Sequence, residues 1–446
     1  MLNNLLSKLK NKHFLVLTGN ASIALVGIVM TFILFRVLEP EKAGLYFYVL
    51  SFSQLCESAR SGFLSTATVK YYAGAQPGRA KTVLGSVWLL ALSLSGIILL
   101  LNLVLWLLLP ETNNESVVLS IKWFGLTYLS TLPADVTFWK LQAEEKYGTM
   151  FWYRMLNSGS TILTYLALIY FDKMTIENAL LYNFLTNCMA SGVGVILGMS
   201  GIGYIVHRSK GCIKELYHYG KYTLGTTSFS MLLGYVDVWM INSLLGPASV
   251  AVYKVSMSFM AFVELPLRSF TTTGMSEMAI QYNRKNYEQV SVIFKKYAGM
   301  LTVAFIPAAA IAYLLADFVT MLVGGAQYHN TEAGSLYQMF MLIAILSPLD
   351  RFNGLTLDIL HQTRTNFYKV IIMLSVKVAG NFLFITLLGS IFGVPLSLLL
   401  STLSGLLFGY YVLNKHIPHT FMGIFTHGYK EMRVYVHSFM KKGEAN

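Results

Sequence analysis

Long apolar runs separated by short polar turns make up most of the chain. The run "VLGSVWLLALSLSGIILLLNLVLWLLL" is longer than the roughly 20 residues that a helix needs to cross a bilayer. Such runs predict transmembrane helices, because a membrane β-barrel shows short alternating strands instead. We expect about twelve helices, near residues 14–38, 43–70, 82–109, 117–142, 148–171, 176–206, 219–245, 250–280, 293–323, 333–360, 366–389 and 393–415.

Two parts of this pattern repeat at one constant offset. The stretch "SFSQLCESARSGF" (51–63) matches "SFMAFVELPLRSF" (258–270), and upstream Pro40 and Tyr46 match Pro247 and Tyr253. The matched helices start on the same side of the membrane, so the repeat is parallel. The predicted fold class is therefore an all-α polytopic membrane protein with two six-helix lobes. A cleft between the lobes and alternating access follow from this arrangement.

The repeat divides the chain into four predicted parts. Residues 1–206 form the N-lobe, 207–218 a cytoplasmic amphipathic linker, 219–415 the C-lobe and 416–446 a basic cytoplasmic tail. Linker and tail mix basic with apolar residues, which is typical of segments that rest on anionic lipid head groups. Binding of a specific partner protein is the alternative for both segments.

The distribution of charge predicts how the chain is oriented in the membrane. Only 12% of the residues are charged, against roughly 25% in soluble proteins. Basic residues gather in the lead "MLNNLLSKLKNK", the tail and alternate loops, which predicts that both termini lie in the cytoplasm. The net charge of +12 is explained by this asymmetry and does not indicate nucleic-acid binding.

Several ionisable residues fall inside the predicted membrane spans. Glu57 and Arg60 share one helix face, and so do Glu264 and Arg268. Such a group costs at least ~2.5–3.5 kcal/mol at the bilayer centre, so it faces protein or water. Further intramembrane charges are Asp237, Lys254, Asp350, Arg351, Asp358 and Lys377, and Pro266 and Pro348 are expected to break two spans.

Two interpretations of these charges stay open. Acids and bases of one helix face neutralise each other as packing pairs, or the cations converge on one cavity with the acids behind them. In the second case the cavity suits an anionic group, and the planar guanidinium of arginine suits phosphate in particular. The three cysteines form no disulfide or zinc pattern, and the sequence contains no catalytic triad, metal motif or phosphate-binding loop. We expect no enzymatic site, metal or cofactor.

The opening of the chain resembles a known family. Residues 11–63, "NKHFLVLTGNASIALVGIVMTFILFRVLEPEKAGLYFYVLSFSQLCESARSGF", combine "LEPEKAGLY" with an intramembrane acid and "RSGF". They resemble the bacterial oligosaccharide (O-antigen type, Wzx-like) flippases of the multidrug/oligosaccharidyl-lipid/polysaccharide exporter (MOP) superfamily. The resemblance implies a V-shaped, MATE-like pair of lobes in the bacterial inner membrane. It also implies translocation of undecaprenyl-diphosphate-linked oligosaccharide from the inner to the outer leaflet, by an antiporter coupled to H⁺ or Na⁺.

The resemblance also implies roles for the intramembrane charges. The substrate-binding candidates, for diphosphate and sugar, are Arg60, Arg268, Lys377, Arg351 and Lys254. The candidates for ion coupling or for orienting the arginines are Glu57, Glu264 and Asp237. We expect Arg60 and Arg268, one from each lobe, to bind the diphosphate together. The expected partners are the lipid-linked oligosaccharide, anionic membrane lipids and other polysaccharide-assembly proteins.

Two alternative functions belong to other classes. A multidrug or small-molecule antiporter of the same superfamily is the first, but five intramembrane cations argue against a cavity for cationic drugs. A membrane polysaccharide polymerase or ligase is the second. Such an enzyme needs catalytic groups outside the membrane, and outward turns such as "LLGPASVA" offer few polar residues.

Overall fold

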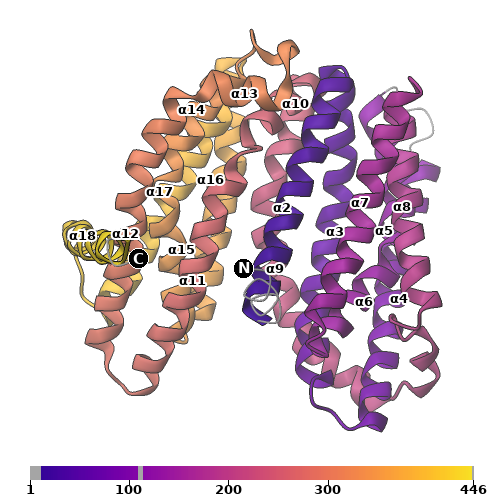
Figure 1. Cartoon of the computed structure of the whole chain (residues 1–446), viewed down its shortest axis with the longest axis horizontal. Coiled ribbons are helices and arrows are strands. Elements are labelled where there is room, and N and C mark those ends of the chain that lie inside the picture. Colours follow the sequence, from indigo (N-terminus) through magenta and orange to yellow (C-terminus); the bar gives the residue numbers. More distant parts are fainter. Residues whose placement is uncertain (1–11, 109–113, 444–446) are drawn as a thin grey trace. The chain divides into compact units, whose positions relative to one another are not determined.

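The structure, a computed structural model, describes residues 12–108 and 114–443 (Figure 1). These residues form helices joined by turns, with no strand among them. The predicted N-terminal lead up to residue 11, part of the turn before residue 114 and the tail residues 444–446 lie outside the described residues. Contacts divide the chain into two compact units, Met1–Asn242 with Gly246–Ala251, and Ser243–Leu245 with Val252–Asn446.

The first unit begins with the indigo helices of Figure 1. Its elements are α2 (Lys12–Val37), α3 (Pro40–Tyr72), α4 (Pro77–Leu108), α5 (Glu115–Ser130), α6 (Leu132–Ala143), α7 (Tyr147–Tyr170), α8 (Ile176–Ile196), η1 (Ile202–His207), α9 (Lys210–Leu245) and the start of α10 (Pro247–Met257). Helix α3 packs against α4, α5, α6 and α8. Its residues Phe63 and Leu64 join Trp88 of α4 and Trp139 of α6 in the core of this unit.

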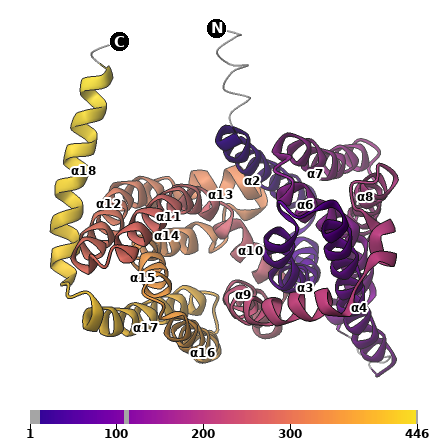
Figure 2. The ribbon, with the colours of Figure 1, turned by 90° about the horizontal axis from the view of Figure 1, so that it is seen from below.

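The second unit holds the remaining helices. They are the rest of α10, α11 (Met260–Asn283), α12 (Tyr287–Leu314), α13 (Ala316–Gly324), η2 (Ala326–Tyr328), α14 (Ala333–Ala344), α15 (Ser347–Ile359), α16 (Thr363–Leu388), α17 (Gly393–His416) and α18 (Phe421–Gly443). Its core contains Phe294 and Tyr297 of α12 and Phe352 of α15. Figure 2 shows α18 running past α12 at the margin of this unit.

Polar side chains cap the first turns of several helices. The side chains of Asn114, Thr175, Ser209 and Asn286 accept hydrogen bonds from free backbone N–H groups at the starts of α5, α8, α9 and α12. Such caps satisfy donors that a helix start leaves without a partner. Because Ser209 caps α9, the predicted linker 207–218 is helical from Lys210 onward and continues into the following span.

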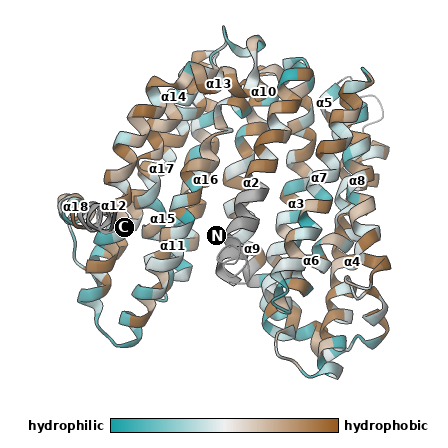
Figure 3. Ribbon diagram, viewed as in Figure 1, coloured by the Kyte–Doolittle hydropathy of each residue, from teal (hydrophilic) through white to brown (hydrophobic). Residues whose placement is uncertain are grey.

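The architecture confirms an all-α polytopic membrane protein. Seven described helical spans are long and apolar enough to cross a membrane, and two bent helix pairs raise the number to nine. Figure 3 shows apolar residues along these helices, and large apolar side chains such as Leu108, Ile196 and Leu387 are exposed. An exposed apolar surface of this kind is expected where helices face lipid.

Some sequence predictions about helix ends and breaks were wrong. The segment 176–206 is not one helix, because α8 ends at Ile196 and the chain turns through Gly198 and Gly201. Both glycines have positive φ, a conformation that side-chain-bearing residues rarely adopt. Pro266 does not break its span either: it lies inside α11, and the 48° bend separates Met257 from Met260. Pro348 is confirmed at a break, since it stands in the first turn of α15 after a 44° bend.

Candidate functional site

Arg60 of α3 lies fully buried in the first unit, surrounded by α4, α5 and α6. Its Nη2 and Nε donate to Asp135 Oδ2 at 2.7 and 3.2 Å. Nη2 also donates to Thr131 Oγ1 at 2.7 Å, and Nη1 donates to Ser95 Oγ at 3.3 Å and to the Tyr128 carbonyl at 3.0 Å. A guanidinium has five N–H donors, and these five hydrogen bonds use all of them.

The break between α5 and α6 explains why Arg60 fits here. Helix α5 ends at Ser130 and α6 begins at Leu132, so carbonyls in the last turn of α5 lack the partners that a continuous helix would supply. Arg60 donates to the Tyr128 carbonyl, and Ser191 of α8 donates to the Ser130 carbonyl at 2.5 Å. Side chains of α3 and α8 therefore satisfy the carbonyl groups at the break and hold it within the first unit.

Glu57 lies one helical turn before Arg60 and joins this group indirectly. Its Oε1 accepts a hydrogen bond from Thr131 Oγ1 at 3.2 Å. The Thr131 hydroxyl has a single proton, and the Tyr128 carbonyl lies within 3.1 Å as a competing acceptor. We call Glu57, Arg60, Thr131 and Asp135 the Arg60 cluster. It combines one guanidinium with two carboxyl groups.

Asp135, and not Glu57, holds Arg60 in place. Asp135 was not among the predicted site residues, although an acid in the apolar stretch "STLPADVTFW" is an intramembrane charge like the others. The expectation that Arg60 offers its guanidinium to a substrate does not fit this conformation, because every donor is already used.

A second group of charges lies in the second unit and is partly exposed. Glu264 and Arg268 belong to α11, and Arg351 belongs to α15. Glu264 Oε2 lies 3.4 Å from Arg268 Nε and 3.5 Å from Arg351 Nη2. The side chains of Arg268 and Arg351 are 73% and 49% exposed. We call these three residues the Glu264 cluster; its formal charge is +1.

The two bent spans create the Glu264 cluster. Helix α11 starts after the first bend and carries Glu264 in its second turn, while α15 starts after the second bend and carries Arg351 in its second turn. In the described part of the chain, neither Arg268 nor Arg351 has another hydrogen-bond or ionic partner. Most of their N–H donors are therefore available to an anion.

The other predicted site residues lie on helices that belong to neither the Arg60 cluster nor the Glu264 cluster. Lys377 is buried in α16, which packs on α17, and Lys254 is half-buried in α10. Asp237 is buried in α9 of the first unit. No group of three or more His, Cys, Asp or Glu side chains within residues 12–108 and 114–443 is arranged to hold a metal ion.

A buried ion pair beside the Glu264 cluster was missed. Lys369 Nζ lies 2.5 Å from Asp350 Oδ1 and donates to the Asp350 carbonyl at 3.0 Å. Lys369 was not among the predicted intramembrane charges, but α16 starts at Thr363 and carries Lys369 into the protein. Asp350 therefore pairs with Lys369, while its neighbour Arg351 pairs with Glu264.

Solved structures define the class of this fold. A multidrug resistance MATE family transporter of the MOP superfamily, in an inward-facing conformation, is similar with a TM-score of 0.69 and 17% identity over 88% of this chain and 95% of its own. The lipid II flippase MurJ, inward closed, is similar with a TM-score of 0.72 and 15% identity over 95% and 92%. A MOP superfamily transporter from Pyrococcus furiosus Vc1 (DSM3638) gives 0.60 and 17% over 90% and 94%.

The family follows from the sequence match. The family model described as "Polysaccharide biosynthesis protein" matches residues 9–263, more than half of the chain, and the MatE model matches residues 223–383. The chain belongs to the polysaccharide biosynthesis protein family, which confirms the Wzx-like resemblance. It has the multi-pass helical fold of solved MOP superfamily transporters. No curated protein matches the chain.

Proposed function

We propose that this transporter moves undecaprenyl-diphosphate-linked oligosaccharide from the inner to the outer leaflet of the bacterial plasma membrane. The observation that carries the proposal is the Glu264 cluster, in which two partly exposed guanidinium groups share one carboxylate. Arginine forks bind phosphate oxygens in pairs, and a diphosphate offers several such oxygens. Membership in the polysaccharide biosynthesis protein family supports a lipid-linked glycan as cargo.

Roles for the remaining charges complete the proposal. Arg268 and Arg351 bind the diphosphate, and Lys254 and Lys377 add positive charge to the same lobe. Arg60 holds the α5–α6 break together with Asp135 and is a positioning residue in this conformation.

Coupling to H⁺ or Na⁺ involves an acid that changes its charge. Glu57 is our first candidate, because the single guanidinium of the Arg60 cluster is already paired with Asp135. Glu264, whose carboxylate holds both arginines of its cluster, and the buried Asp237 are the alternatives.

The proposed mechanism is alternating access between two lobes. We propose twelve spans in two six-helix lobes related by a parallel repeat, with the N-lobe at 1–206, the linker at 207–218, the C-lobe at 219–415 and the tail at 416–446. A described helix within each of the twelve predicted segments supports this count. The matched positions of α3 and of α10–α11 support the repeat.

Similarity in fold to a multidrug transporter supports a second candidate, a small-molecule antiporter. The Glu264 cluster discriminates between the two cargos. Its formal charge of +1 attracts an anionic group, whereas a cavity for cationic drugs needs a net negative charge. We therefore favour the lipid-linked glycan.

A vesicle assay tests this function directly. Purified protein is reconstituted with labelled undecaprenyl-diphosphate-linked oligosaccharide, and its arrival in the opposite leaflet is followed with and without a proton gradient. Arg268→Ala and Arg351→Ala are each expected to lower this rate about tenfold or more, because each removes a charge-assisted hydrogen bond to phosphate. Arg284→Ala, an exposed arginine just after α11, is the matched control and keeps the wild-type rate.

Wild-type movement in both cluster variants would refute the diphosphate role. Gradient-driven export of a cationic dye, lost in Glu264→Gln while the lipid-linked glycan stays in its leaflet, would establish the antiporter instead.

A further inference from the structure

Helix α18 crosses α12 in direct backbone contact. A Cβ atom at Gly299 of α12 would overlap the carbonyl oxygen of Ile424, and one at Gly428 would overlap the backbone of Gly299. The turn before α18 is also held firmly, since the Tyr410 ring stacks on Phe421 with ring centroids 4.3 Å apart. This part of the predicted tail is therefore a fixed element of the second unit.

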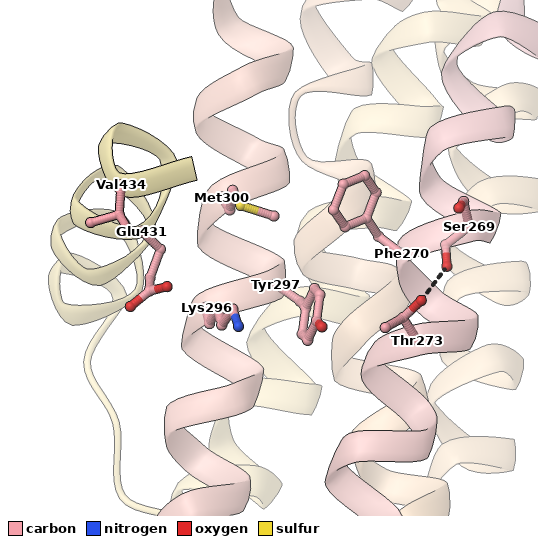
Figure 4. A pocket seen from close by; sticks show the side chains of 8 residues that line it. All are labelled: Ser269, Phe270, Thr273, Lys296, Tyr297, Met300, Glu431 and Val434. Carbon is pink, nitrogen blue, oxygen red and sulfur yellow. Dashed lines mark hydrogen bonds between the residues drawn. The ribbon is translucent and has the colours of Figure 1, made fainter. Parts of the chain in front are cut away.

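A groove lies beside this crossing, between α11, α12 and α18. It encloses about 460 Å³, in the range of small-ligand pockets. Figure 4 shows its lining side chains, which are Ser269, Phe270, Thr273, Lys296, Tyr297, Met300, Glu431 and Val434. An adjacent cavity of about 370 Å³ shares Lys296 and Glu431 with it. We call these lining residues the α18 groove.

The sequence of α12 places this groove at the level of lipid head groups. The 18 residues from Tyr297 to Leu314 contain no acid or base. At 1.5 Å per residue they span about 27 Å, close to the roughly 30 Å hydrocarbon core of a bilayer. Lys296 precedes this stretch directly, so its ammonium lies where the hydrocarbon ends. Helix α18 meets α12 within one turn of this point.

The charged groups of the groove have opposite signs and come from different helices. Lys296 of α12 has an ammonium with three donors, and the Ser269 hydroxyl of α11 has no partner among the described residues. Both groups suit a phosphate oxygen.

Glu431 of α18 contributes a carboxylate to the groove, which only accepts hydrogen bonds. Its nearest ionic neighbour among the described residues is His427, at 4.0 Å. Glu277, the other acid nearby, already accepts a hydrogen bond from the Tyr297 hydroxyl at 2.6 Å. Glu431, which has no hydrogen-bond donor within the described residues, is therefore an acceptor available to a ligand.

We propose that the α18 groove binds the head group of an aminophospholipid. The lipid phosphate contacts Lys296, its primary ammonium contacts Glu431, and its glycerol and first methylenes lie against Met300 and Phe270. A purely anionic head group would set its negative charge against Glu431. A choline head group has no N–H, so it would place a positive charge near the Glu431 carboxylate without donating a hydrogen bond to it.

This lipid site goes beyond the proposed transport function and differs from the general attraction of anionic lipids to the tail. That attraction involves Lys430 and Arg433, which are exposed on α18 next to the apolar Met422 and Tyr429. Lys430→Ala is therefore a matched control: it removes a charge next to Glu431 in sequence but outside the groove.

Lipid binding to the full chain is measured by native mass spectrometry after exchange into micelles doped with phosphatidylethanolamine, phosphatidylcholine or phosphatidylglycerol. Wild type is expected to retain phosphatidylethanolamine about tenfold better than either other lipid, the factor of one charge-assisted hydrogen bond. Glu431→Gln removes this preference, Lys296→Ala lowers retention of phosphatidylethanolamine, and Lys430→Ala preserves both. Elution of each variant as a monodisperse peak shows that it is folded.

The opposite outcomes are equally clear. Preferred retention of phosphatidylglycerol by wild type, or an unchanged preference in Glu431→Gln, would overturn the proposal. Equal competition by free phosphoethanolamine at the same concentration would show a site for a soluble ligand and would also overturn it. None of these readouts depends on transport.

Discussion

Arg60 and Arg268 lie at nearly equivalent positions of the sequence repeat, yet their surroundings differ in kind. Arg60 is fully buried and gives all five donors to the protein, whereas Arg268 is largely exposed and has one weak contact with Glu264 at 3.4 Å. A guanidinium whose N–H donors all bind the protein stabilises the fold. One with unused donors is available to bind an anion. Substitutions of the two arginines should therefore affect different properties.

Replacing Asp135 with Asn tests whether the buried Arg60 stabilises the fold. The variant leaves Arg60 buried without its counter-charge, and breaking a buried ion pair in this way costs about 3–5 kcal/mol. We expect a clearly lower melting temperature of the purified protein in detergent. Glu264→Gln, at the exposed ion pairs of the second unit, is the control and should change stability by about 1 kcal/mol or less. Equal melting of the Asp135 variant and wild type would show that Arg60 is stabilised in another way.

At the scale of elements, three helix breaks carry the polar sites. The break between α5 and α6 positions the Arg60 cluster, and the bends before α11 and α15 position the Glu264 cluster. Proline alone does not locate these breaks. Pro133 and Pro348 stand in the first turn of a new helix, while Pro266 and Pro307 lie inside α11 and α12. A proline in the first turn loses no helical hydrogen bond, so it is favoured there.

The corner between α17 and α18 gives an element-scale prediction. His419 is buried there between the rings of Phe294 and Tyr410, and its Nδ1–H donates to the Ile417 carbonyl at 2.7 Å. Burial lowers the pKa of His419 below its ordinary value of 6.5, and the nearby charge of Lys295 acts in the same direction. The unfolded chain therefore binds a proton more readily than the folded chain.

The stabilisation from neutral His419 is present above about pH 6.5 and is lost as the pH falls from there toward the lowered pKa. We expect the wild-type melting temperature to drop between pH 7.5 and pH 5, with a smaller drop in His419→Gln. Parallel pH curves for both proteins would show that the corner does not depend on this proton.

At the scale of the whole molecule, each unit packs its own core, and the division between them falls near the junction of α9 and α10. Gly246 in this junction has φ +88° and ψ 172°, a conformation open essentially to glycine alone. By contacts α9 belongs to the first unit up to Asn242, so the packing boundary lies further along the chain than the predicted linker at 207–218. The lobe boundary of the repeat stays a prediction.

Orientation in the membrane is the prediction at this scale. The excess of basic residues in alternate loops predicts cytoplasmic termini. A fluorescent protein fused after Asn446 should fluoresce in a bacterial host. Alkaline phosphatase, which is active only outside the cytoplasm, should be active when inserted between Asp172 and Lys173 and inactive between Arg284 and Lys285. The reverse pattern would invert the proposed direction of transport.

The sequence by itself determined the class of this protein and the position of most helices. Apolar runs and polar caps act over a few residues, so they can be recognised without knowing which helices touch. The same local information identified Glu264 and Arg268 as partners, because they lie four residues apart on α11.

Only the tertiary structure decided which intramembrane charges pair across helices. Arg60 takes Asp135 from α6, Lys369 takes Asp350 from α15, and Arg351 joins Glu264 from α11. These choices depend on how the helices are bent and packed, and spacing along the chain does not encode them. For the same reason only the structure distinguishes Arg60, whose N–H donors are all used within the protein, from Arg268, whose donors are available to an anion. Burial is a property of the packed helices and not of the residue itself.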